Sequence, residues 1–117
     1  MIVPYCASKF GLVGLTKALA AELAPHQVTV NCVCPVGVPG TGMGQEVLKW
    51  KVGATGKPSE EILAAAAASI PLGRNATVAD VVNAVVFFLA DRSGYLTGVA
   101  LDVDGGSLSA VPLPGVE

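Results

Sequence analysis

Hydrophobic residues follow a helical spacing in some parts of this chain and a strand spacing in others. From Ala7 to Leu23 the chain is apolar around most of the helix circumference, and Pro25 ends this predicted helix. Residues 28–34 are rich in β-branched side chains and apolar on both alternating faces, as in a buried parallel strand that Pro35 ends. Small side chains form one stripe of the helix, where another backbone could approach closely: Ala7, Gly11, Gly14, Ala18 and Ala21. We therefore predict a core or interface helix followed by a buried strand.

Glycine and proline residues divide the middle of the chain into a predicted loop and two predicted helices. Residues 35–44 hold four glycines and two prolines and are expected to form a loop that lets backbone approach a ligand. A short helix is predicted over residues 45–52, with a break at 53–58. Ser59 is the expected N-cap of a helix that continues to Ala68 and stops before Pro71.

The last third of the chain predicts one more helix and one more strand. Thr77 and Asp80 have the spacing of a capping box, and the helix that they open should end near Asp91. Residues 98–103 form a predicted strand. Strands alternating with helices indicate an α/β fold with a parallel sheet. Two parallel strands are too few to stand alone, so this chain should be one end of a larger sheet.

Composition narrows the classes of function. Hydrophobic residues make up 52% and charged residues 14%, with a mean hydropathy of +0.63, which excludes a largely disordered chain. The net charge is −2 and basic residues do not cluster, so we expect no nucleic-acid partner. The longest apolar stretch, residues 78–90, is interrupted by Asp80 and Asn83 and is too short for a membrane span. The first residues lack the pattern of a signal peptide.

Three cysteines and one histidine are too few for a clear metal site. Cys32 and Cys34 stand two apart on the predicted strand and are poorly placed for a disulfide with each other. His26 is the single histidine, and a zinc site would need further ligands. We expect reduced, buried thiols in a cytoplasmic protein, and no bound metal.

Tyr5 and Lys9 are the residues best suited to chemistry. At a spacing of four residues both side chains project from the same face of a helix. A lysine ammonium beside a tyrosine phenol favours the phenolate, so the pair can exchange a proton near neutral pH. This spacing alone is weak evidence, because it also arises by chance on solvated helices.

Several motifs around this pair resemble the short-chain dehydrogenase/reductase family. They are YCASKFGLVGLTKALAAELA from Tyr5, VTVNCVCP from Val28, PLGR from Pro71, DVVNAVVFFLA from Asp80, YLTG from Tyr95 and LDVDGG from Leu101. The resemblance implies the C-terminal part of one Rossmann-like, doubly wound NAD(P)-binding domain over residues 1–106, followed by a tail at 107–117. It also implies hydride transfer between NAD or NADP and a small-molecule alcohol or carbonyl substrate.

The resemblance also assigns expected roles to individual residues. Tyr5 would be the catalytic acid/base, and Lys9 would assist it and hydrogen-bond the nicotinamide ribose. The loop after the strand would line the nicotinamide, through Pro35, Gly37, Val38 and Thr41. Residues 44–69 would form the substrate lid. The first helix, Ala7 to Leu23, would join copies of the chain in a homo-oligomer.

The chain departs from the family pattern in two respects. Val36 stands where most members have glycine, either as an insertion or as a replacement in a longer loop like that of relatives acting on polyol phosphates. The glycine-rich dinucleotide turn, the catalytic serine and the relay asparagine all lie upstream of Tyr5 in the family, and residues 1–4 do not supply them. We therefore expect the isolated chain to be inactive, and to associate or be poorly soluble. The alternative function is a non-catalytic module that acts through helix–helix association.

Overall fold

The computed structural model describes residues 2–108, which form two compact units. The first unit comprises residues 2–34 and 82–102, and the second comprises residues 35–81 and 103–108. Among the described residues, the buried apolar side chains are Ala20 in the first unit and Ile70 in the second. Each unit therefore leaves most of its large apolar side chains at least partly exposed.

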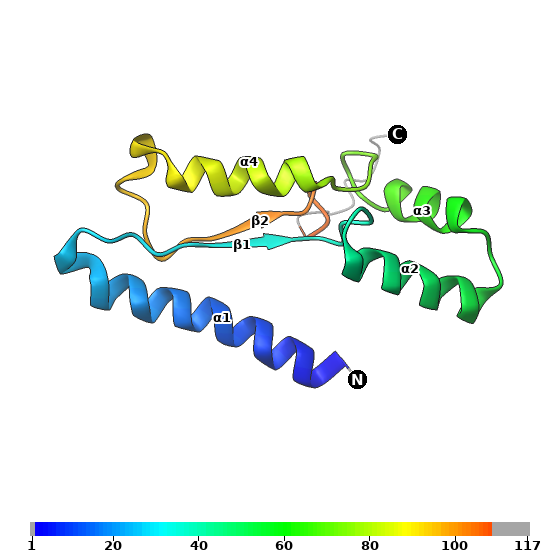
Figure 1. Cartoon of the computed structure of the whole chain (residues 1–117), viewed down its shortest axis with the longest axis horizontal. Helices are drawn as coiled ribbons and strands as arrows, with labels where there is room; N and C mark the ends of the chain where they lie inside the picture. Colours follow the sequence, from blue (N-terminus) through cyan, green and yellow to red (C-terminus); the bar gives the residue numbers. More distant parts are fainter. Residues whose placement is uncertain (1, 109–117) are drawn as a thin grey trace, which may run out of the picture. The chain divides into compact units, whose positions relative to one another are not determined.

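The first unit is built on two adjacent strands, β1 (Cys32–Pro35) and β2 (Ala100–Val103). The Cys32 amide donates to the Val99 carbonyl oxygen at 2.9 Å, and the Val36 amide donates to the Val103 carbonyl oxygen at 3.2 Å. Both partners advance by four residues in the same direction, so the strands are parallel as predicted. Figure 1 shows the helices α1 (Ile2–Leu23) and α4 (Val78–Leu89) on opposite sides of the strand pair. This arrangement is the helix–sheet layering of an α/β fold.

Both strands are shorter than predicted, because side chains replace part of the backbone ladder. The Val30 amide donates to the Thr97 hydroxyl at 3.0 Å. The Asn31 carboxamide donates to the Leu96 carbonyl at 2.9 Å and accepts from the Val99 amide at 3.0 Å. Residues 30–31 are thus hydrogen-bonded to residues 96–99 before regular strand geometry begins.

The α1 helix begins five residues earlier than predicted and ends where predicted. It starts at Ile2 and includes Pro4, which is tolerated in a first turn because the amides there lack an intrahelical acceptor. Ser8 lies inside the helix, where its hydroxyl donates to the Tyr5 carbonyl at 2.7 Å. The end at Leu23 is confirmed, and Pro25 lies in a 3₁₀ turn, η1 (Ala24–His26).

The small-residue stripe of α1 does not contact the sheet. The buried residues are Thr16 and Ala20, and the Ala20 Cβ lies 3.4 Å from where a Cβ on Gly98 would be. Gly11 and Gly14 have open space around them, with nothing within 4 Å of an added Cβ. Of the two predicted roles, a core helix is wrong for most of α1, because only its C-terminal half has buried residues, and an interface helix stays a prediction.

The second unit contains a helical hairpin, α2 (Gly42–Thr55) and α3 (Ser59–Ala68), which pack against each other. The α2 helix is longer than the predicted 45–52 because Thr41 caps its start, and it runs through Gly53 until Gly56 ends it at a φ of 69°. The N-cap prediction for Ser59 is wrong. Pro58 occupies that position and no side chain caps α3. The end of α3 at Ala68, before Pro71, is as predicted.

A turn after β2 packs against the segment that follows α3. Gly105 has a φ of 64°, and a Cβ there would lie 2.6 Å from Ile70 Cγ2. The Leu72 amide donates to the Gly105 carbonyl at 3.2 Å. The Asp104 carboxylate accepts from the amides of Leu108 (2.7 Å) and Gly106 (2.9 Å), which lowers its pKa. Of the expected tail at 107–117, residues 109–117 lie outside the described residues.

The capping box at α4 is confirmed. The Thr77 hydroxyl accepts from the Asp80 amide at 3.2 Å, and the Asp80 carboxylate accepts from the Thr77 amide at 2.7 Å. The helix ends at Leu89 rather than near Asp91, because a second 3₁₀ turn, η2 (Asp91–Ser93), follows it.

Candidate active site

Tyr5 and Lys9 lie one turn apart on an exposed part of α1. The Lys9 Nζ is 5.4 Å from the centroid of the Tyr5 ring, so the ammonium stands over the aromatic face. The Tyr5 side chain is accessible, with 52% of the residue exposed. The phenol and the ammonium are thus neighbours on one accessible surface.

The loop after β1 supplies the other expected site residues. Pro35 and Gly37 are exposed, whereas Val38 and Thr41 are half-buried. The Val36 amide donates to the Val103 carbonyl at 3.2 Å, so this residue continues the ladder beyond β1.

The Thr41 hydroxyl has a structural role that sequence reasoning missed. It donates to the Val38 carbonyl at 2.9 Å and accepts from the Gly44 amide at 3.1 Å, which caps α2. A hydroxyl has one proton and two lone pairs, so one lone pair of Thr41 is left to accept a further hydrogen bond. A threonine four residues before the start of the predicted helix 45–52 was the signal that could have revealed this cap.

Because Gly44 has no side chain, the first turn of α2 lies directly against the loop. A Cβ on Gly44 would lie 2.1 Å from the Val38 carbonyl oxygen and 2.9 Å from the Pro39 Cα, distances that no side chain can occupy. The start of α2 is therefore held directly on the segment that carries Val38 and Thr41.

The candidate residues fall into two groups. Tyr5 and Lys9 belong to the first compact unit, and Pro35, Gly37, Val38 and Thr41 belong to the second. The structure brings the members of each group close together. The loop 35–41 is bound internally by its own hydrogen bonds and by the start of α2.

The cysteines are free but not all buried. Cys6 is exposed, which corrects the expectation of buried thiols, because residues 2–12 of α1 are all exposed. Cys32 and Cys34 are half-buried on β1. The pKa of the Cys34 thiol is raised, mainly by partial burial and next by the neighbouring Cys32.

Within residues 2–108, acidic, histidine and cysteine side chains form no group of three or more that could hold a metal ion. Over the same residues, none of the helices combines the length and apolar character that crossing a membrane requires.

The family follows from comparison with known proteins. Residues 2–107 match the family model described as enoyl-(acyl carrier protein) reductase. The chain belongs to the short-chain dehydrogenase/reductase family, and its fold is the C-terminal portion of that family's Rossmann-type sheet.

Individual relatives and structures agree with this assignment. The chain is 44% identical over 102 residues to L-xylulose reductase of Homo sapiens. This alignment covers 87% of this chain and 38% of that protein. Among solved structures, it matches a short chain dehydrogenase family protein from Francisella tularensis with a TM-score of 0.85 and 31% identity, over 91% of this chain and 43% of the other. Actinorhodin polyketide ketoreductase, in a structure with NADPH, matches with a TM-score of 0.81 and 37% identity, over 90% of this chain and 40% of the other.

The chain spans about two fifths of the length of the curated relatives that it matches, for example 38% and 39% of the first two.

Proposed function

We propose that this chain supplies the catalytic C-terminal part of an NAD- or NADP-dependent oxidoreductase that interconverts a secondary alcohol and a ketone. The observation that carries the proposal is the Tyr5–Lys9 pair, with the ammonium 5.4 Å from the ring centroid on an accessible face of α1. In the direction of oxidation, Tyr5 Oη takes the proton of the substrate hydroxyl, and in the direction of reduction it returns that proton to the carbonyl oxygen. Lys9 assists this step by placing its positive charge beside the Tyr5 ring.

The cofactor is NAD or NADP, and when bound it accepts or donates the hydride. Support comes from the NADPH in the structure of the ketoreductase relative. The free lone pair on the Thr41 hydroxyl fits an N–H donor such as a carboxamide, and the exposed Gly37 lets its backbone approach a flat ring closely. Pro35 and Val38 would complete this side of the nicotinamide site, and Lys9 would also hydrogen-bond the ribose.

Further proposals concern the whole protein. We propose that residues 1–106 complete one dinucleotide-binding domain, with 107–117 as its tail. The exposed face of α1, with open space around Gly11 and Gly14, is the surface through which copies associate. The free thiols of all three cysteines suit a reducing cytoplasm.

The test is a chimera in which this chain replaces the matched C-terminal segment of human L-xylulose reductase. The host supplies the dinucleotide turn and the upstream catalytic groups. We expect NADPH- or NADH-dependent reduction of ketones, followed by absorbance of the reduced cofactor. Tyr5→Phe keeps the packing of the ring and removes the proton donor, so kcat should fall by roughly 10²–10⁴-fold while cofactor affinity changes little.

A control variant and two possible outcomes make the result decisive. Tyr95→Phe also removes a phenol, from a fully exposed residue outside α1, and should leave turnover unchanged. A chimera that folds and binds cofactor but turns over equally well with Tyr5→Phe would refute Tyr5 as acid/base. A folded chimera without any turnover would instead favour the non-catalytic module.

A further inference from the structure

Pro39 and Gly40 form the centre of a β-turn in the candidate cofactor loop. The Thr41 amide donates to the Val38 carbonyl at 3.2 Å, which closes a four-residue turn over residues 38–41. A proline followed by a glycine at the two central positions is typical of a type II turn, in which the glycine has a positive φ. Gly40 does not have a positive φ, unlike five other glycines of the described residues, so the turn is of type I. The turn therefore has the form that its sequence does not favour.

Gln45 holds the central peptide of this turn. Its carboxamide donates to the Pro39 carbonyl at 2.6 Å. Its backbone amide donates to the Thr41 carbonyl at 2.9 Å, which fixes Gln45 in the first turn of α2. Types I and II differ in the direction of the central peptide, which is turned over between the two forms. The Gln45 side chain thus binds the one peptide that distinguishes them, and this bond accounts for the type I form.

The direction of the Pro39 carbonyl also fixes the direction of the Gly40 N–H. The described residues contain no cis peptide bond, and the C=O and N–H of a trans peptide point in opposite directions. The Gly40 N–H therefore points away from the Gln45 carboxamide. No hydrogen bond within residues 2–108 uses this N–H, and Gly40 is exposed. An uncommitted donor thus stands directly before Thr41, at a place that Gln45 controls.

The ends of the turn are held without help from Gln45. The Thr41 hydroxyl donates to the Val38 carbonyl and accepts from the Gly44 amide. Gly44 also lies directly against the Val38 carbonyl. A change between types I and II rotates the central peptide and leaves the outer residues in place, so Thr41 can cap α2 in either form. The loop therefore contains an element with two states, and the Gln45 side chain selects one of them.

We propose that Gln45 is a positioning residue for the cofactor, because it keeps the turn in the form in which the Gly40 N–H, rather than the Pro39 carbonyl, meets bound NAD or NADP. The inference rests on the proposed function, which places the cofactor against this loop. Without the carboxamide, nothing opposes the preference of the Pro–Gly sequence for type II. Only the fraction of molecules in the type I form is then ready to bind, and the dissociation constant rises in inverse proportion to that fraction.

The experiment measures the affinity of the chimera with L-xylulose reductase for NADPH and NADH, by the fluorescence of the reduced nicotinamide. Gln45→Met keeps the length and neutrality of the side chain but removes the donor. We expect the dissociation constant of the preferred cofactor to rise by about tenfold, the effect of losing one hydrogen bond. At saturating cofactor, kcat should change little, because bound cofactor selects the type I form.

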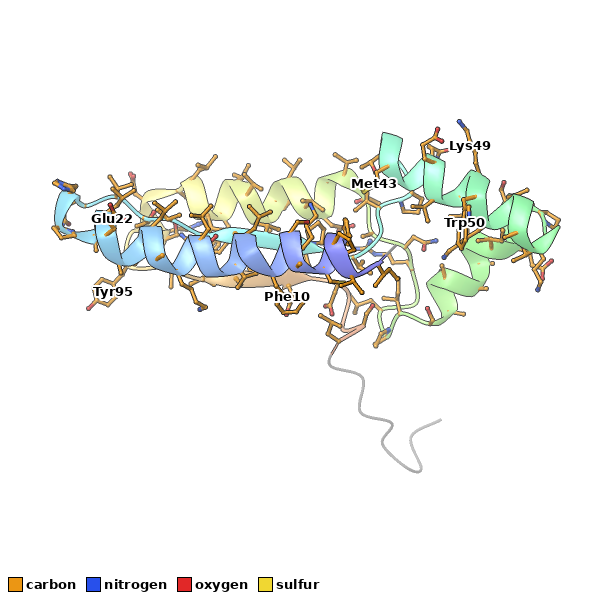
Figure 2. The ribbon with its side chains drawn as sticks, turned by 90° about the horizontal axis from the view of Figure 1, so that it is seen from below. Phe10, Glu22, Met43, Lys49, Trp50 and Tyr95 are labelled. Carbon is orange, nitrogen blue, oxygen red and sulfur yellow. The ribbon has the colours of Figure 1, made fainter. Side chains whose placement is uncertain are left out.

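Glu46→Met is the matched control, since it makes the same replacement at the next residue. The Glu46 carboxylate pairs with Lys49 at 2.8 Å and not with the loop. Figure 2 shows Met43 at the end of α2 that joins the loop and Lys49 projecting outward further along the helix. We expect this variant to leave the cofactor affinity unchanged.

A second substitution separates control of the turn from a merely structural role. Alanine does not readily adopt a positive φ, so Gly40→Ala favours type I whether or not Gln45 is present. There is room for this side chain, because the nearest atom to a Cβ on Gly40 is the Val78 Cγ2 at 4.0 Å. We expect Gly40→Ala alone to leave the affinity unchanged, and the Gln45→Met, Gly40→Ala double variant to recover it. Such a recovery would not follow if Gln45 only stabilised α2.

Nuclear magnetic resonance follows the turn without any cofactor. Isotope labelling of the proline carbonyl and the glycine nitrogen selects Pro–Gly peptides, and the signal that Gly40→Ala deletes is that of Gly40. In a type II turn the Hα of Pro39 lies close to the Gly40 amide hydrogen, and in type I it does not. We expect the Overhauser effect between these two hydrogens to be weak in the chimera and strong in Gln45→Met.

The outcomes separate this inference from the proposed function. Turnover that does not depend on Tyr5, together with weaker cofactor binding in Gln45→Met and recovery by Gly40→Ala, would refute the catalytic assignment and support this inference. Turnover that depends on Tyr5, with an unchanged affinity in Gln45→Met, would overturn this inference alone. Weaker binding without recovery would make Gln45 a structural residue and overturn it too. Weaker binding in Gly40→Ala alone would show that the cofactor needs the type II form, which also contradicts it.

Discussion

The Arg74 guanidinium and the Asp80 carboxylate face each other through two parallel hydrogen bonds of 2.8 Å each. Asp80 also accepts from the hydroxyl and the amide of Thr77, both at 2.7 Å. The pair with Arg74, and then the bonds from Thr77, hold the pKa of the Asp80 carboxyl well below its usual range. The turn before α4 is therefore fastened to the first turn of that helix by one carboxylate.

We predict that stability falls in acid because of this carboxylate. Its pKa is lower in the folded chain than in the unfolded chain, where about 3.9 is expected, so its contribution is complete above that value and is lost as the pH falls below it. The melting temperature, measured between pH 7 and pH 2, should show this loss, and Asp80→Asn should reduce its fall in acid. Glu46→Gln, which breaks only the exposed ion pair with Lys49, should leave the fall in acid unchanged.

Gly44→Ala should destabilise the second unit. The added Cβ would lie 2.1 Å from the Val38 carbonyl oxygen, so the loop or the helix must move, and such overpacking costs about 1–3 kcal/mol or more. Gly53→Ala is the control within the same helix, where nothing lies within 4 Å, and it should stabilise the chain by roughly 0.5–1 kcal/mol. Urea unfolding of the two variants measures both effects. Equal stability of the two alanine variants would contradict the close contact.

Asn31→Ala should weaken the start of the strand pair. The substitution removes the bonds to the Leu96 carbonyl and the Val99 amide and should cost about 1–3 kcal/mol. Asn83→Ala, at an exposed position of α4, is the matched control and should change stability little. Hydrogen exchange of the Val99 amide gives a local readout, and we expect it to be faster only in the Asn31 variant.

Lys9→Met in the chimera should affect both chemistry and cofactor binding, unlike Tyr5→Phe. The methionine keeps a long apolar side chain but removes the ammonium from the face of the Tyr5 ring. We expect lower turnover and a weaker cofactor affinity, because the substitution removes both the charge beside the phenol and the proposed hydrogen bond to the ribose. Steady-state turnover and titration of cofactor test this, with Lys17→Met as a control on the same helix. An unchanged cofactor affinity would contradict the ribose contact.

Features decided by neighbours in the sequence could be predicted from the sequence alone. The capping box of Thr77 and Asp80, the end of α1 before Pro25 and the one-turn spacing of Tyr5 and Lys9 all depend on contacts three or four residues apart. Helical geometry brings such residues together whatever the rest of the chain does. The family motifs could be recognised for the same reason, because they are short runs of adjacent residues.

Only the tertiary structure decided which surfaces are packed and which are free. The strands are short because Asn31 reaches partners more than sixty residues away, and the packed face of α1 is that of Thr16 and Ala20 because Gly98 lies against it. Gly44 is required by the Val38 carbonyl, and α2 packs against α3 as a helical hairpin. These contacts join segments distant in sequence or depend on the direction of a whole helix, so no local pattern of residues specifies them.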